Sequence, residues 1–272
     1  MRALGLLIVV GCGAAPHPYT LRQFLDVHRS NTASLSPDGS RIAFETNATG
    51  DWQVWLTTAK GDAPRQLTHF PSSVGGVLWS PTGDDLLVSS DHDGDQQYQL
   101  YLIGAGGSAP RPLTAEPDVK HDIGGWSRDG RSVFFASNAR DRRYFDCYLM
   151  DVATKQARRV LERDAVMHAD AISADGRWLA AIERTSEVDQ NVYIADTTTG
   201  AARSITPHDG VARFHIVGFA ADASALYVVS DAGREFLNLA SIDLATGALH
   251  YLEDTPHDAD FTALSRDGHQ LA

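Results

Sequence analysis

The chain has 272 residues, 43% of them hydrophobic, and a formal net charge of −12. It is long and apolar enough for a globular core. Its acidity excludes nucleic acid as a partner, because such binding relies on basic patches, and we assign the charge to solubility. The two cysteines, Cys12 and Cys147, are too few for a disulfide scaffold. Cys147 alternates with polar residues in a strand-like run, which predicts a buried position.

Residues 1–18 have the features of a signal peptide. A single arginine precedes an apolar run at residues 3–10, far shorter than the roughly 20 residues that span a bilayer but suited to a signal-peptide core. The Val-Val-Gly-Cys sequence ending at Cys12 resembles the bacterial lipoprotein box, in which that cysteine is lipidated. Cleavage after Ala15 and a misassigned start codon are the alternatives. We expect an exported protein, periplasmic or lipid-anchored in the cell envelope, with no other membrane contact.

A four-residue turn sequence recurs along the rest of the chain, with spacings of 44, 47, 46, 47 and 45 residues. Proline sets φ for the second position, aspartate bonds nearby amides and glycine takes positive φ, so the sequence predicts a tight hairpin. In the fifth copy Ala223 replaces the glycine, which predicts a different turn or a cost of ~1 kcal/mol. The copies are Ser36–Gly39, Ser80–Gly83, Ser127–Gly130, Ser173–Gly176, Ala220–Ala223 and Ser265–Gly268.

Four short β-type runs fill each repeat, and none shows a helical period. In the first repeat they include RIAFETN, QVWLTT and PRQLT. Four strands every ~45 residues are typical of a β-propeller blade; a β-sandwich has no reason to repeat one turn sequence. We therefore predict an all-β propeller with five complete blades and the start of a sixth, at residues 32–70, 74–115, 122–162, 168–206, 214–253 and 260–272.

The predicted propeller, residues 32–272, is incomplete at its C-terminus and follows a lead-in segment at residues 19–31. A propeller closes when its last blade meets its first, and otherwise it leaves apolar faces and strand edges exposed. We therefore expect the protein to continue beyond Ala272. The alternative, a natural end at Ala272, predicts an open arc of five blades with a frayed terminal hairpin.

Three segments together resemble a known family: Tyr19–Phe44, Ser90–Ile103 and Ser230–Gly247. They are similar to the N-terminal propeller of bacterial serine peptidases of the prolyl oligopeptidase family, particularly acylaminoacyl-peptidase-like and dipeptidyl-peptidase-like members. TolB-like propellers share the turn motif, but the YTLRQFL sequence that opens the first segment is more specific. The resemblance implies a propeller that caps a C-terminal α/β-hydrolase domain and admits only short peptides.

The catalytic part of that family is missing from this sequence. Its hydrolase domain needs a Gly-x-Ser-x-Gly elbow followed by an aspartate and a histidine, and the sequence has no such elbow. We therefore assign no catalytic residue, and expect this chain to be inactive without the absent hydrolase domain. The paired glutamates of the dipeptidyl peptidase IV branch are also missing, so the substrate-binding residues stay unknown. The alternative function is a non-enzymatic, TolB-like periplasmic propeller that binds a protein partner.

Other charged clusters suggest no cofactor and no metal. Asp91–Asp95 alternates carboxylates but lacks the later glutamate of a calcium loop, so we predict a solvated loop. The eleven histidines lack the spacing of zinc sites. The arginines within Asp141–Asp146 belong to a charged loop tip, or contact a substrate carboxylate or the missing domain. Arg234 and Glu235 pair with each other or face the central channel.

Overall fold

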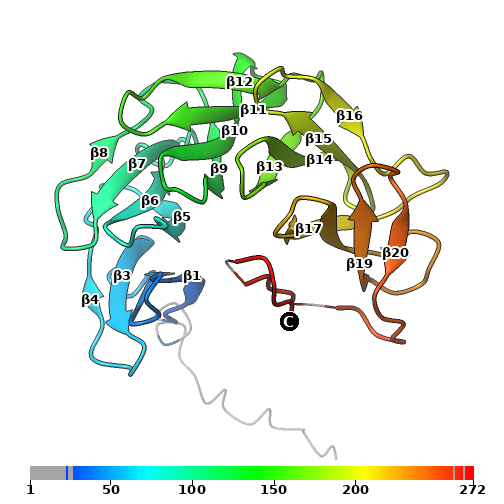
Figure 1. Ribbon diagram of the computed structural model, residues 1–272. Helices are drawn as coiled ribbons and strands as arrows, with labels where there is room; N and C mark the ends of the chain where they lie inside the picture. The colour runs from blue at the N-terminus through cyan, green and yellow to red at the C-terminus, as the bar shows by residue number, and fades with distance from the viewer. Residues whose placement is uncertain (1–22, 24–26, 260, 266) are drawn as a thin grey trace, which may run out of the picture.

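The protein is a β-propeller of five blades arranged as an open arc (Figure 1). The computed structural model describes residues 23, 27–259, 261–265 and 267–272. In these residues each blade is a four-stranded antiparallel sheet whose strands follow chain order from the innermost to the outermost. The all-β prediction and the five blades are confirmed. The predicted signal peptide, with Cys12, and most of the lead-in segment lie outside the described residues.

The strand bounds follow the predicted repeats. Blade 1 contains β1 (Ser30–Leu35), β2 (Arg41–Thr46), β3 (Gln53–Thr58) and β4 (Arg65–Gln66). Blade 2 contains β5 (Val74–Trp79), β6 (Asp85–Ser90), β7 (Gln99–Gly104) and β8 (Arg111–Pro112). Blade 3 contains β9 (His121–Trp126), β10 (Ser132–Asp141), β11 (Tyr144–Asp151) and β12 (Ala157–Leu161). Blade 4 contains β13 (Met167–Ile172), β14 (Trp178–Ser186), β15 (Asp189–Asp196) and β16 (Ala202–Ser204). Blade 5 contains β17 (Phe214–Phe219), β18 (Ala225–Ser230), β19 (Asn238–Asp243) and β20 (Leu249–Tyr251).

The last residues form the predicted start of a sixth blade. The backbones of Ala263 and Ala272 exchange two hydrogen bonds of 2.8 and 2.9 Å, and Leu264 bridges Leu271. This terminal hairpin lies in the gap between β1 and β17 (Figure 1). On the other side of the gap Leu35 is 57% exposed, whereas its counterpart Trp79 in blade 2 is 6% exposed. Leu35 of the first blade is therefore an apolar side chain without a covering neighbour among the described residues.

In five of the six copies of the turn an aspartate at the third position holds the turn, and the second copy has Thr82 there instead. In the third copy, the Ser127 hydroxyl donates to Asp129 at 2.7 Å and the Arg131 amide donates to the same oxygen at 3.0 Å. The hydrogen bond from the Arg131 amide is the main reason, and the one from the Ser127 hydroxyl the second, that the pKa of Asp129 lies below its usual value. The ionised aspartate thus fixes the hairpin between the first two strands of the blade.

The fifth turn keeps the same form although it lacks glycine. Ala223 takes a φ of 55°, its amide donates to the Ala220 carbonyl at 2.9 Å, and Asp222 accepts the Ser224 amide at 3.0 Å. The strained version of the turn is therefore the one that forms. The cost falls on Ala223, because its Cβ crowds the backbone at positive φ.

We predict that Ala223→Gly stabilises the protein by about 0.5–1 kcal/mol. Glycine relieves the left-handed strain, and the greater freedom it gives the unfolded chain offsets only part of the gain. Urea denaturation followed by circular dichroism measures the change. The control Ala245→Gly, in an exposed turn without positive φ, should instead lower stability slightly. A decrease in both variants would contradict the prediction.

Apolar side chains fill each junction between neighbouring blades. Fully buried members include Leu86 between blades 1 and 2, Phe135 between blades 2 and 3, and Phe214 between blades 4 and 5. Cys147 lies in the cluster between blades 3 and 4 with no exposed surface, and burial raises the pKa of its thiol. The predicted buried role of Cys147 is confirmed.

Long cationic side chains also cross from blade to blade. Arginines of the fourth strand donate to a backbone carbonyl in the following blade at three junctions, and a lysine donates backwards at the remaining one. Charge-assisted bonds of this kind are stronger than neutral ones. The four bonds are Arg65 to Ala105 at 3.0 Å, Arg158 to Thr197, Arg203 to Leu244, and Lys155 to Pro112 at 2.8 Å.

Candidate functional site: the axial opening

The innermost strands lie around the axis of the arc (Figure 1). Residues of these strands line two cavities, and we call this axial region the axial opening. Each of these strands has a β-bulge, so one residue is skipped in its pairing with the next strand. A bulge bends the strand and increases its twist. The skipped residues are Thr32, Gly75, Gly124, Asp170 and Val217.

Two of the bulges require glycine because their neighbours approach closely. A Cβ on Gly124 would lie 2.5 Å from the Phe134 ring and 2.6 Å from the carbonyl oxygen of Ala169 in blade 4. A Cβ on Gly75 would lie 2.6 Å from the Tyr98 ring. The innermost strands are therefore packed as tightly as their backbones allow. The Gly-Gly pairs in β5 and β9 were the sequence signal for this packing, and the repeat alone did not reveal it.

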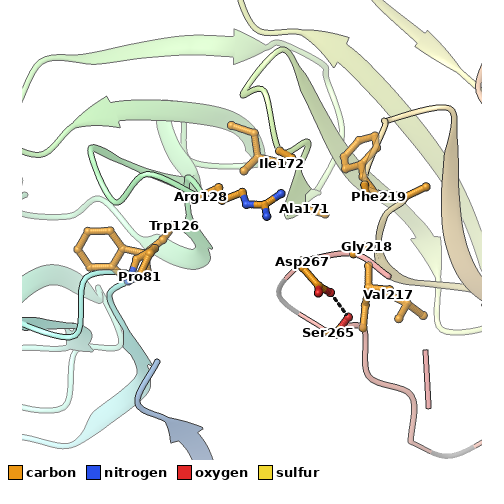
Figure 2. Close-up of a pocket in the computed structure, with 15 residues that line it drawn as sticks. Pro81, Trp126, Arg128, Ala171, Ile172, Val217, Gly218, Phe219, Ser265 and Asp267 are labelled. Atoms are coloured by element: carbon orange, nitrogen blue, oxygen red, sulfur yellow. Dashed lines mark hydrogen bonds between the residues drawn. The ribbon is translucent and has the colours of Figure 1, made fainter. Parts of the chain in front are cut away.

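One end of the opening lies where the repeated turns converge, and we call it the turn mouth. It contains a cavity of about 240 Å³ (Figure 2). Its lining combines polar groups with large apolar side chains, among them Trp126, Ile172 and Phe219. The second residues of four turns line it as well, namely Pro81, Arg128, Ala174 and Ala221. Its position is thus set directly by the repeat.

A larger cavity of about 470 Å³ lies toward the other end, around the starts of β5 and β9. Lys120 and Asp122 line it, and the Lys120 Nζ atom lies 3.4 Å from Asp122 Oδ1. His121 is 2% exposed there, and burial, helped by the charge of Arg142, lowers its pKa to about 4. Tyr98 has a raised pKa, first because of burial and then because of nearby carboxylates. Perturbed groups of this kind around a cavity are typical of functional sites.

Glu45 is the most strongly perturbed buried carboxyl beside this cavity. It is 3% exposed, and its Oε1 atom has no hydrogen-bond partner. Burial raises its pKa to about 7, although a hydrogen bond from Thr32 opposes the shift. Thr32 has a φ of 30°, which is rare for a β-branched residue and marks local strain.

We predict that Glu45→Gln flattens the pH dependence of stability. The folded pKa of Glu45 lies near 7, above the ordinary value of 4.5. Its contribution is therefore fully present below about pH 4.5 and is lost as the pH rises through 7. The difference between the wild type and the variant should change by on the order of 2 kcal/mol between pH 5 and 8. Urea denaturation at both pH values measures it, and parallel pH profiles would refute the assignment.

The predicted acidic loop is only partly solvated. Asp93 and Asp95 are exposed, but Asp91 is 7% exposed and accepts the Gln96 amide at 3.1 Å. The side chain of Asp91 turns inward because the loop folds back on it. No group of metal-ligating side chains occurs in the part of the chain that the structure describes.

The arginines at the tip of blade 3 differ in their partners and in their exposure. Arg143 pairs with Asp141 at 2.7 Å, and its side chain is 73% exposed, as a charged loop tip requires. Arg142 donates to the Asn138 carbonyl at 2.9 Å. Arg140, which precedes the predicted cluster, binds the buried Asp146 through two bonds of 2.7 and 3.1 Å. It also reaches Asp164, in the connection to blade 4, at 2.9 Å. Arg140 thus fastens the hairpin to the following connection.

Arg234 has a different partner from those predicted. Its guanidinium pairs with Asp254 at 2.8 Å and lies 3.6 Å from the centre of the Tyr251 ring. We predicted that Arg234 pairs with Glu235 or faces the central channel. The structure shows instead that it contacts the segment after β20. Within the described residues, no helix has the length and apolar character needed to cross a membrane.

The blades, the turns and the axial opening define a β-propeller protein. The chain belongs to a specific propeller family, because the family model described as TolB beta propeller domain matches residues 25–247. Solved structures agree on the fold. A putative TolB from Agrobacterium tumefaciens has a TM-score of 0.63 at 20% identity, covering 84% of this chain and 81% of that one. A prolyl endopeptidase structure has a TM-score of 0.69 at 14% identity, and the match covers 88% of this chain and 38% of that one.

Curated relatives include peptidases. The chain is 25% identical over 230 residues to dipeptidyl aminopeptidase BIII of Pseudoxanthomonas mexicana, covering 82% of this chain and 33% of the relative. It is 27% identical over 176 residues to the uncharacterized peptidase YuxL of Bacillus subtilis strain 168, and this match covers 61% of this chain and 24% of the relative. The chain therefore spans about a quarter to a third of the length of these relatives.

Proposed function

We propose that this chain is the substrate-gating propeller of an exported serine peptidase that acts on short peptides. The observation that carries the proposal is the similarity to peptidases of which the chain covers 33% and 24%. The remainder of such a protein is long enough for an α/β-hydrolase domain. The cavities along the axis of the arc suit a gate, since a peptide that passes along the axis would contact the innermost strands.

Sequencing the gene past codon 272 tests the proposal first. A continuing frame with a Gly-x-Ser-x-Gly elbow, followed by an aspartate and a histidine, supports it. In the longer protein, kcat/KM should then fall steeply as the substrate lengthens from dipeptides to an unfolded protein. A frame that ends within about one blade would reject the peptidase role.

The turn mouth gives a sharper test of gating in the longer protein. Ala174→Trp places a large ring in the mouth and should slow the cleavage of long peptides more than that of dipeptides. Ala245→Trp, in an exposed turn on the outer part of blade 5, is the matched control and should leave the length profile unchanged. Equal effects of both variants on all lengths would show that substrates do not pass through this mouth.

Export forms part of the same proposal and concerns the N-terminal segment. If Cys12 carries a lipid, Cys12→Ala should move the protein from the membrane fraction to the soluble fraction of the envelope. Mass spectrometry of the mature N-terminus distinguishes this outcome from cleavage after Ala15. An intact Met1 in the purified protein would contradict export.

The second candidate is a TolB-like propeller that binds a protein partner without catalysis. The family model and the match to 81% of a putative TolB favour it. It predicts that the gene completes the propeller without a hydrolase domain. Affinity purification from the cell envelope should then recover one stoichiometric partner.

A further inference from the structure

His208 lies in the connection between blades 4 and 5, at residues 205–213, and both of its ring nitrogens contact oxygen atoms. The Nδ1 atom is 2.8 Å from the Thr206 carbonyl oxygen, and the Nε2 atom is 3.0 Å from Asp189 Oδ1. A carbonyl and an ionised carboxylate only accept hydrogen bonds, so each ring nitrogen has to donate. A neutral imidazole has one N–H group, whereas the imidazolium has two. The two contacts together therefore require the protonated form of His208.

The surroundings of the ring favour this positive charge. The side chains of His208 and Asp189 are 15% and 21% exposed, so salt screens their ion pair only in part. Asp209 is a second nearby carboxylate, whereas Phe214, which packs on the ring from β17, is uncharged. Burial lowers the pKa of His208, but the bonds to Thr206 and Asp189 and the two carboxylate charges outweigh it. The pKa of His208 therefore lies above its ordinary value of 6.5.

His208 anchors the middle of the connection. At one end, the Thr206 hydroxyl accepts the Val192 amide at 2.8 Å. At the other end, the Ala212 carbonyl accepts the Gln190 amide at 2.9 Å. Within the described part of the chain, the two bonds of the His208 ring are the only hydrogen bonds made by residues 207–211. The position of this segment therefore depends on a single side chain.

The other blades hold the equivalent segment with groups that keep their charge near neutral pH. In three of them, an amide side chain at the start of the third strand donates to the backbone of the connection that follows. In blade 3, the guanidinium of Arg140 donates to the Arg163 carbonyl at 2.8 Å. Neither an amide nor a guanidinium loses a proton near neutral pH, but an imidazolium does. The amide bonds are Gln53 to Phe70 at 3.1 Å, Gln99 to Val119 at 2.8 Å and Asn238 to Thr255 at 3.3 Å.

We propose that His208 is a pH-operated clamp on the connection between blades 4 and 5. Deprotonation leaves one N–H group for two acceptors, so one bond is lost and residues 207–211 detach while the blades stay folded. Because the folded-state pKa is raised, the clamp is intact below pH 6.5 and is released as the pH rises through that pKa. The connection leads into the start of β17, at the end of the axial opening opposite the turn mouth. Release therefore makes one position of that rim mobile, whether or not the protein is a peptidase.

Methyl NMR of the chain with ¹³C-labelled valine tests the clamp. Val211 reports on the clamped segment, where it is 66% exposed. Val119 is the internal control, because its carbonyl is held by the amide of Gln99. The methyl order parameter of Val211 should fall between about pH 5.5 and 8.5, while that of Val119 stays constant. The midpoint of the fall should equal the pKa of His208 measured from its ring Hε1 signal.

Three variants separate the clamp from other effects of pH. Asp189→Asn keeps an acceptor but removes its charge, so the midpoint should move down by about one pH unit. His208→Gln gives a neutral clamp like those of the other blades, and the order parameter of Val211 should then no longer depend on pH. His250→Gln, at an exposed position of β20, is the matched control and should leave the titration of Val211 unchanged.

Three results would overturn the proposal. The first is an order parameter of Val211 that is the same at both ends of the pH range. The second is a decrease that persists with the same midpoint in His208→Gln. The third is a parallel decrease at Val119, which would assign the change to a loosening of the whole propeller.

Discussion

Arg140→Ala is expected to lower the free energy of unfolding by about 3–5 kcal/mol. The side chain of Asp146 is only 1% exposed, and Arg140 binds both of its oxygens. Removing the guanidinium leaves an ionised group buried without its main partner, which is among the most destabilising of single changes. It also removes the bond to Asp164 that ties the blade 3 hairpin to the connection with blade 4.

The same hairpin provides the control. Arg143→Ala removes an equal charge from an exposed ion pair, and such pairs contribute at most ~1 kcal/mol. Chemical denaturation of both variants, monitored by tryptophan fluorescence, gives the comparison. Arg159 lies 3.7 Å from Asp146, and a loss below about 1 kcal/mol in Arg140→Ala would mean that Arg159 replaces the missing partner.

Gly124→Ala is expected to destabilise the protein by about 3 kcal/mol. The added methyl group would meet the Phe134 ring at 2.5 Å and the carbonyl oxygen of Ala169 at 2.6 Å. The ring can rotate only at the expense of the packing between blades 3 and 4, and the carbonyl belongs to the backbone of another innermost strand. Overpacking of this kind costs 1–3 kcal/mol and sometimes more.

Gly106→Ala is the matched control, because no atom lies within 4 Å of the added methyl group and φ is not positive. It should leave stability unchanged or raise it slightly. Thermal unfolding followed by circular dichroism at 218 nm, the region of β-sheet absorption, would compare the two. Equal melting temperatures for Gly124→Ala and the wild type would show that the innermost strands can move apart.

The sequence predicted the features that depend on neighbouring residues. The Ser-x-Asp-Gly turns place a hydroxyl, a carboxylate and a positive-φ position within four residues. Together with the variant copies Ser80–Gly83 and Ala220–Ala223, their regular recurrence located every blade. The turn mouth itself was not predicted, although its position follows from the repeat, because the second turn residue of blades 2 to 5 lines it. Even the alanine at position 223 was identified as the strained copy.

Features that depend on distant partners were not predicted. Arg140 meets Asp164 across 24 residues, and nothing in the local run around Arg140 distinguishes that arginine from the exposed Arg143. Asp91 appeared to be one of three similar loop carboxylates until the fold buried it. The bulges were also missed, because the register of a strand is set by the pairing of whole sheets and not by its own composition.

The cationic bridges between blades have a consequence for the order of synthesis. The donor Arg65 lies 40 residues before its acceptor, Ala105. A ribosome adding about 5–20 residues each second needs several seconds to deliver that distance. During that interval a newly made blade has its own hydrogen bonds but only one neighbour. Each blade can therefore form its cationic bond to the following blade only after that blade has been synthesised. A pause in translation within a repeat would therefore prolong the exposure of one apolar face.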